Sequence, residues 1–117
     1  MRILIYHRNW FVRSELEEFL CELKCQAHFA ETIESAVTIL NNYYVEAAFL
    51  EIRGVVDIGI LQYINQYCQN VRAILVMENE FINVISAIKN GSYGILRQPF
   101  GLTEIQRHLP GLTSDQE

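Results

Sequence analysis

The sequence predicts an α/β fold in which a five-stranded parallel sheet lies between two layers of helices. Five short apolar segments alternate with segments whose apolar residues recur at helical spacing. The connections are only a few residues long, so successive strands run parallel through right-handed crossovers. The central segment, residues 45–54, contains the continuous run Ala-Ala-Phe-Leu before Glu51, which is typical of a strand covered by helices on both faces.

The first half of the chain predicts two strand-helix units. Residues 2–6 form the first strand, and Asn9 is placed to cap a helix. The apolar residues of this helix are Val12, Leu16, Phe19, Leu20 and Leu23. Residues 26–30 form a weaker second strand, and Thr32 is placed to cap a helix that ends at Asn41-Asn42. The apolar face of this helix carries Ile33, Ala36, Val37 and Leu40.

The second half predicts three helices and two further strands. A third helix follows Gly54, and we expect Gly59 near its start to allow close packing. Residues 71–77 and 93–97 form the last two strands. The inward residues of the three helices are Leu61, Ile64 and Cys68; Phe81, Val84, Ile85 and Ile88; and Leu102, Ile105 and Leu109. Asn90-Gly91 ends the fourth helix and Pro110-Gly111 the short last one.

Length and composition predict one cytoplasmic domain. We assign residues 1–109 to the domain and residues 110–117 to a polar tail or the start of a linker. The net charge of −5 and the lack of a Lys/Arg cluster exclude direct nucleic-acid binding by this domain. No apolar run approaches the roughly 20 residues of a membrane span or the core of a signal peptide. Three cysteines, an odd number, fit reduced thiols.

The order and spacing of these elements, with Ile-Leu-Arg-Gln-Pro-Phe at residues 95–100, resemble the CheY-like receiver domain of bacterial response regulators. The resemblance covers residues 2 to 109 and implies a flavodoxin-like, doubly wound fold with five helices. In that family the first strand ends in an acidic pair and the third in a phosphate-accepting Asp. The fourth ends in Ser or Thr and the fifth in Lys-Pro, where the peptide is frequently cis.

None of the family's phosphorylation residues is present at the matching position. His7 and Arg8 match the acidic pair, and Glu51 matches the phosphoacceptor. Val76 matches the hydroxyl residue and Gln98 the lysine. Ile95 stands where the family often keeps an aromatic switch residue. The resemblance therefore implies a pseudo-receiver with a degenerate phosphorylation pocket.

These departures remove the chemistry of phosphoryl transfer. Mg²⁺ needs hard oxygen ligands, whereas His7 and Arg8 offer nitrogen and positive charge. Val76 has no hydroxyl for a phosphoryl oxygen, and Gln98 lacks the charge of lysine. We therefore expect no metal site, no cofactor and no enzymatic activity.

What remains is Glu51 beside an arginine. We predict that Arg8 and Glu51 form an ion pair across adjacent strand ends and hold one conformation. Two alternatives stay open: both side chains turn to solvent, or Glu51 mimics the phosphorylated state. His7 either fills the space of the lost metal or senses pH, and we favour the first.

Other residues carry weaker signals. Cys21, Cys25 and His28 make an incomplete metal or redox set, so packing is the preferred interpretation. We expect Trp10 to pack inward over the pocket; if it is exposed, it indicates a partner contact. Together with Tyr93 and Arg97 it forms a candidate interaction surface.

The resemblance and the missing residues together predict an atypical response-regulator receiver in two-component or phosphorelay signal transduction. It acts without phosphorylation, as a protein-interaction or homodimerisation module, with transcriptional output through a separate, covalently linked effector domain. Two alternatives remain. One is an unconventional phosphoacceptor that uses Glu51. The other is a sensor of small ligands or anions in the pocket of His7, Arg8, Glu51 and Gln98.

Overall fold

The computed structural model describes residues 1–77 and 93–109. Its elements are β1 (Arg2–Tyr6), α1 (Trp10–Glu22), β2 (Gln26–Ala30), α2 (Ile33–Asn42), β3 (Ala47–Leu50), α3 (Val55–Tyr67), β4 (Arg72–Met77), β5 (Gly94–Arg97) and α5 (Leu102–His108). The predicted helix around residues 81–88, its stop at Asn90-Gly91, and the polar tail lie outside the described residues.

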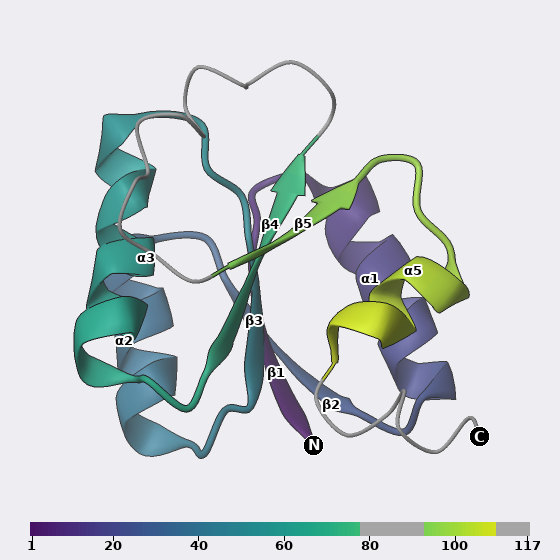
Figure 1. Ribbon diagram of the computed structural model, residues 1–117, viewed down its shortest axis with the longest axis horizontal. Helices are drawn as coiled ribbons and strands as arrows, with labels where there is room; N and C mark the ends of the chain where they lie inside the picture. Colours follow the sequence, from purple (N-terminus) through teal and green to yellow (C-terminus); the bar gives the residue numbers. More distant parts are fainter. Residues whose placement is uncertain (78–92, 110–117) are drawn as a thin grey trace.

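The five strands form one parallel sheet in the order β2-β1-β3-β4-β5 (Figure 1). This is the strand order of the flavodoxin-like fold, so the predicted fold class is confirmed. The direction of winding reverses between β1 and β3, which lie side by side. A ligand or regulatory site in such a sheet is expected beyond the carboxyl ends of these two strands.

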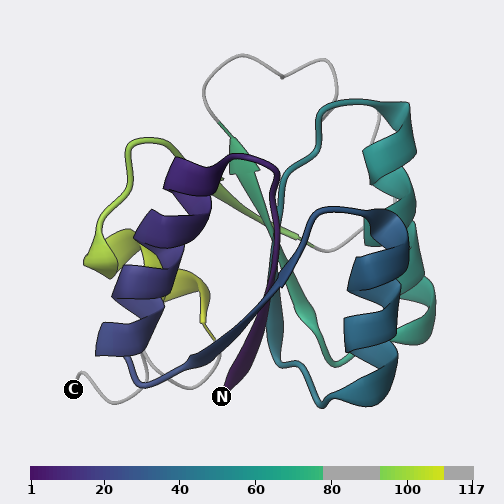
Figure 2. The same cartoon turned by 180° about the vertical axis from the view of Figure 1, so that it is seen from behind.

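Helices cover both faces of the sheet, as Figures 1 and 2 show: α2 and α3 lie on one face, α1 and α5 on the other. The four residues of β3 are all buried and divide by parity between the two cores. Ala48 and Leu50 join the α2/α3 core, while Ala47 and Phe49 join the α1/α5 core. This explains why the central strand is apolar at every position.

The helix ends follow local hydrogen-bonding chemistry. Asn9 Oδ1 accepts from the backbone N–H groups of Phe11 and Val12, and Thr32 caps α2 through the Ser35 N–H. α1 ends in a Schellman motif, in which the Cys25 N–H bonds Leu20 O and the Lys24 N–H bonds Cys21 O. Lys24 takes the left-handed position of this motif, with φ 62°.

Two glycines behave differently from each other. A Cβ built on Gly59 would meet no atom within 4 Å, so the expected close packing at Gly59 is wrong. A Cβ on Gly94 would lie 2.7 Å from Nδ1 of His108, because the His108 ring lies against β5. Gly94 is therefore the glycine whose missing side chain lets two elements approach.

Other details refine the predicted elements. α3 stops at Tyr67, so Cys68 is its C-cap and still packs, partly buried, against the α2/α3 core. α5 ends at His108, two residues before Pro110. Among residues 1–77 and 93–109, no helix is both long and apolar enough to cross a membrane.

Candidate functional site

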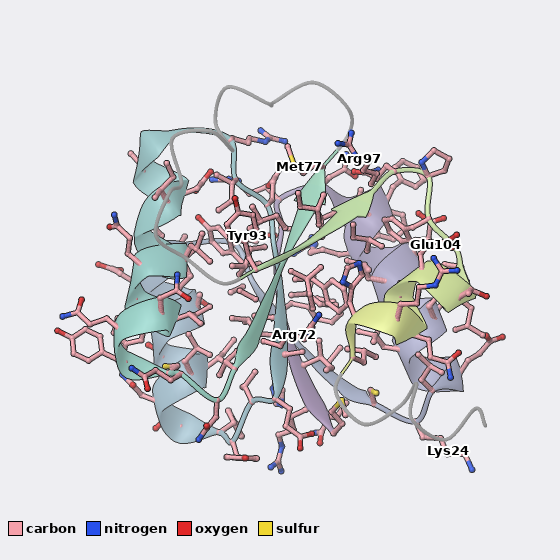
Figure 3. The ribbon with its side chains drawn as sticks, in the orientation of Figure 1. Lys24, Arg72, Met77, Tyr93, Arg97 and Glu104 are labelled. Atoms are coloured by element: carbon pink, nitrogen blue, oxygen red, sulfur yellow. The ribbon has the colours of Figure 1, made fainter. Side chains whose placement is uncertain are left out.

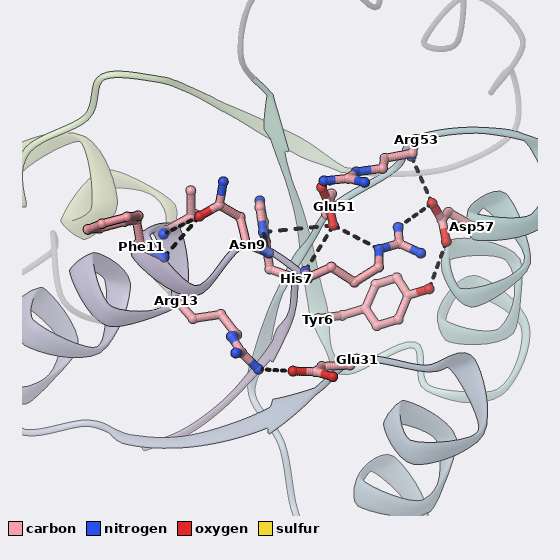
Figure 4. A network of polar contacts seen from close by, with 11 residues as sticks. Tyr6, His7, Asn9, Phe11, Arg13, Glu31, Glu51, Arg53 and Asp57 are labelled. Atoms are coloured by element: carbon pink, nitrogen blue, oxygen red, sulfur yellow. Dashed lines mark hydrogen bonds and ion pairs between the residues drawn. The ribbon is translucent and has the colours of Figure 1, made fainter.

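The ends of β1 and β3 bring together three of the five predicted pocket residues: His7, Arg8 and Glu51 (Figure 4). Tyr6 is the last residue of β1, and Glu51 follows β3 directly. The backbone N–H of Glu51 donates to Tyr6 O at 2.8 Å, which continues the sheet hydrogen bonding past the end of β3. The side chain of Glu51 therefore leaves the sheet beside His7 and Arg8.

Arg8 and Glu51 form the predicted ion pair. Arg8 Nε lies 3.1 Å from Glu51 Oε1, and the backbone N–H of Arg8 donates to the same oxygen at 3.0 Å. The other oxygen, Oε2, accepts from Arg53 Nε. The Glu51 side chain is only 10% exposed, so the alternative in which both side chains turn to solvent is wrong.

Asp57, in the first turn of α3, is a site residue that the sequence did not reveal. Arg8 Nη2 donates to its Oδ2 at 2.6 Å, and the hydroxyl of Tyr6 donates to its Oδ1 at 2.7 Å. The backbone N–H of Arg53 also donates to Oδ2, at 2.8 Å. One guanidinium thus joins the ends of β1 and β3 to the start of α3.

The signal for Asp57 in the sequence was ambiguous. An acidic residue in the first turn of a helix is common, because it interacts favourably with the helix dipole. Nothing in the spacing distinguishes a solvent-facing acid from this buried one. The sequence also gave no signal for Tyr6 as a site residue, because it is the last residue of an apolar strand.

The charges in this network compensate one another. Burial alone would raise the pKa of Glu51, but the Arg8 N–H, His7 and the guanidinium groups of Arg8 and Arg53 hold that pKa below its ordinary value. Burial also opposes ionisation of Asp57, and the bonds from Arg8, Tyr6 and the Arg53 N–H lower its pKa overall. Two guanidinium groups therefore face two carboxylates, with a net charge of zero.

Two further shifts keep the network in one protonation state. The hydrogen bond to Asp57 raises the pKa of Arg8 against the opposing effect of burial. Burial and the hydrogen bond to Asp57 raise the pKa of Tyr6 to about 12, so its hydroxyl stays protonated as a donor. The Arg8 guanidinium also lies 5.4 Å from the centre of the Tyr6 ring, within cation–π range.

His7 is buried next to the ion pair. Its Nδ1 accepts a hydrogen bond from the Asn9 N–H at 3.1 Å and lies 3.8 Å from Glu51 Oε1. With Nδ1 acting as an acceptor, the neutral ring carries its proton on Nε2. Burial lowers the pKa of His7 despite the nearby Glu51, so the ring is neutral at pH 7.

An open pocket of about 380 Å³ lies at this edge of the sheet. Four of the five predicted pocket residues line it: His7, Glu51, Val76 and Gln98. The other lining residues are Asn9, Ile52, Arg53 and Met77. The fifth, Arg8, is absent from the lining and contacts Asp57. Ile95, at the predicted switch position, is half-buried and packs against the α2/α3 core. The Gln98-Pro99 peptide is cis.

The residues present do not fit the Mg²⁺ ion that the family resemblance implies. Mg²⁺ requires free, hard oxygen ligands in octahedral geometry. Here Glu51 and Asp57 are the acidic residues of the network, and all four of their carboxylate oxygens accept hydrogen bonds. Within the described ranges, no three His, Cys, Asp or Glu residues are grouped to hold a metal ion.

The candidate surface residues are not equivalent. Trp10 is 63% exposed, so the expected inward packing is wrong. The reason is helix phase, since α1 turns Val12 and Leu16 to the core and Trp10 away from it. Arg97 is exposed at the end of β5, opposite Met77 of β4, whereas Tyr93 is half-buried against the α2/α3 core (Figure 3).

Comparisons with solved structures agree with the observed topology. NtrX from Brucella abortus superposes with a TM-score of 0.79 at 20% identity, over 97% of this chain and 27% of NtrX. The CheY-like response regulator receiver domain protein from Methanospirillum hungatei JF-1 gives 0.76 at 15% identity, over 91% of this chain and 87% of that one. Chemotaxis protein CheY4 from Vibrio cholerae gives 0.73 at 13% identity, over 92% and 98%.

At these identities the likeness establishes the fold. This chain has the fold of CheY-like receiver domains, and it spans about a quarter of the length of NtrX. No protein-family model matches the sequence, and no curated protein sequence matches it.

Proposed function

We propose that this chain is an atypical receiver domain that takes part in signal transduction without being phosphorylated. The observation that carries the proposal is the position of the Arg8 guanidinium, hydrogen-bonded to both Glu51 and Asp57. In a phosphorylated receiver this space would hold a metal ion and the incoming phosphoryl group. In this chain the Arg8 guanidinium supplies the positive charge that the metal ion would supply there, and it is always present.

The electrostatics of the network support this proposal. A divalent cation is drawn to excess negative charge, whereas two arginines already neutralise Glu51 and Asp57. Both oxygens of Glu51 are engaged, which weighs against its use as a phosphoacceptor. The apolar side chain of Val76 lines the pocket where a hydroxyl donor would be needed. These points also weigh against catalysis.

The proposed role is that of a protein-interaction module. Its partner is another protein or a second copy of the chain, and its output passes through a covalently linked effector domain, such as a transcriptional one. The net charge of −5 argues against direct nucleic-acid binding by this domain. We also propose that the domain works in the bacterial cytoplasm, which the resemblance to bacterial response regulators implies.

The proposal is tested with Mg²⁺ and beryllofluoride, an analogue of the phosphoryl group. A ligand at 100 times its Kd stabilises a folded protein by about 2.7 kcal/mol, which raises the Tm of a domain of this size by roughly 10 °C. We expect no such rise, and no change of molecular mass by light scattering, for wild type or Glu51→Gln. A receiver with intact acidic residues serves as the positive control.

Two results would overturn the proposal. One is a rise in Tm that requires both Mg²⁺ and beryllofluoride and is lost in Glu51→Gln. The other is covalent labelling of Glu51 by acetyl phosphate, detected by mass spectrometry.

A further inference from the structure

A small groove lies between α1 and the edge strand β2, outside the network described above. It has a volume of about 210 Å³. We call it the α1–β2 groove, and its lining residues are Trp10, Arg13, Ser14, Glu17 and Phe29. β2 is the edge strand of the sheet on this side, so within residues 1–77 and 93–109 no further strand pairs with its outer edge.

The geometry of α1 explains why aromatic side chains remain exposed here. Trp10, Arg13, Ser14 and Glu17 recur at helical spacing and form one stripe. The stripe is distinct from the core-facing one, so Trp10 stays 63% exposed at one end of the groove. Phe29, also exposed, comes from β2, where it pairs in register with Ile5. Two aromatic side chains from different elements therefore line one hollow.

The charges of the groove indicate what kind of group it binds. Arg13 Nη1 lies 2.7 Å from Glu31 Oε2, so an ion pair already neutralises its charge (Figure 4). Glu17 has no ion-pair partner among residues 1–77 and 93–109. The charged side chains that line the groove are therefore Arg13, paired with Glu31, and Glu17. The groove thus combines exposed aromatic rings with an unpaired carboxylate.

We propose that the α1–β2 groove binds an arginine side chain on an apolar segment of a partner protein. A guanidinium group stacks on aromatic rings and also pairs with a carboxylate through two parallel hydrogen bonds. Trp10 and Phe29 supply the rings, and Glu17 supplies the carboxylate. Apolar residues beside the arginine cover Phe11, which is 77% exposed and in edge contact with Trp10. The inference deepens the proposed function, because it specifies the surface of the interaction module and the partner's chemistry.

The test uses the fluorescence of Trp10, the only tryptophan of the chain. The probe is an acetylated and amidated peptide of leucine and alanine with one central arginine. We expect a saturable change in Trp10 fluorescence, and binding weaker by about tenfold when neutral citrulline replaces the arginine. Glu17→Gln should weaken binding of the arginine peptide by a similar factor, whereas Glu18→Gln, in the same helix but outside the groove, should not.

Three outcomes would overturn the inference: no saturable change, equal binding of the arginine and citrulline peptides, or equal effects of Glu17→Gln and Glu18→Gln. Glu17 is exposed, so its substitution leaves folding intact, and far-UV circular dichroism checks this. Failure here leaves the proposed function standing, because that proposal is tested with Mg²⁺ and beryllofluoride. Conversely, a response to beryllofluoride would overturn the proposed function without changing peptide binding.

Discussion

Replacing Arg8 by methionine tests the central feature of the site, because methionine keeps much of the side-chain length and removes the charge. The change deletes the guanidinium bonds to Glu51 and Asp57, whose side chains are 10% and 5% exposed. Removing one partner of a buried ion pair costs about 3–5 kcal/mol. Glu51 keeps Arg53, and Asp57 keeps the Tyr6 hydroxyl and the Arg53 N–H, so we expect a smaller loss of about 2–3 kcal/mol.

The matched control is Arg13→Met, which makes the same chemical change where the partner carboxylate is exposed. Glu31, the partner of Arg13, is 58% exposed, so the control should lose less than about 1 kcal/mol. Urea unfolding at pH 7 measures the free energy of unfolding of both variants. Equal losses in the two variants would refute the argument that the Arg8 network is a buried structural centre.

The pH dependence gives a second check on the same variant. The pKa values of Glu51 and Asp57 are lowered in the folded state, so their contribution to stability is present above their unfolded pKa values of about 4.3 and 3.9. That contribution is lost as the pH falls through the folded values. The gap between wild type and Arg8→Met should therefore be largest near neutral pH and shrink as the pH falls below about 4. A gap that stays constant down to pH 3 would contradict the assigned charges.

Four other changes have defined outcomes in urea unfolding. Gly59→Ala should stabilise the domain by about 0.5–1 kcal/mol, because its Cβ meets open space inside a helix. Lys24→Gly should gain about 0.5 kcal/mol at the left-handed end of α1, and a loss would contradict the Schellman geometry. Gly94→Ala should cost about 1–2 kcal/mol through contact with the His108 ring, and a His108→Ala background should relieve this cost. The pKa of His7 is lowered by burial, so stability should fall as the pH drops from 7 to 5; His7→Asn should flatten that dependence.

The arrangement of strands and helices was largely readable from the chain. Helical spacing in residues 10–23 and the uninterrupted apolar run before Glu51 reflect burial on one side of a helix and on both sides of a strand. Helix caps at Asn9 and Thr32 were equally readable, because a side chain satisfies N–H groups only two or three residues away. The end of α1 could not be predicted in the same way, because Lys24 takes a left-handed conformation that glycine usually adopts.

The candidate site was predicted only in part, and the missing part involves contacts between distant segments. Glu51 and Arg8 were paired correctly because adjacent parallel strands end at the same edge of the sheet. Asp57 was missed because its role depends on how α3 returns over that edge and on the reach of the Arg8 side chain. Trp10 was placed inward, although the phase of α1 around its own axis turns it to solvent.

The sequence by itself therefore determined the fold class and the edge of the sheet where the candidate site lies. These follow from local periodicity and residue chemistry, which need no knowledge of long-range contacts. Only the tertiary structure decided that one guanidinium serves two carboxylates from separate elements, and that two aromatic side chains line a groove together with Glu17. Both depend on the direction that side chains take after packing. Arg8, for example, is 43 positions from Glu51 and 49 positions from Asp57, and it meets them within hydrogen-bond distance only in the folded chain.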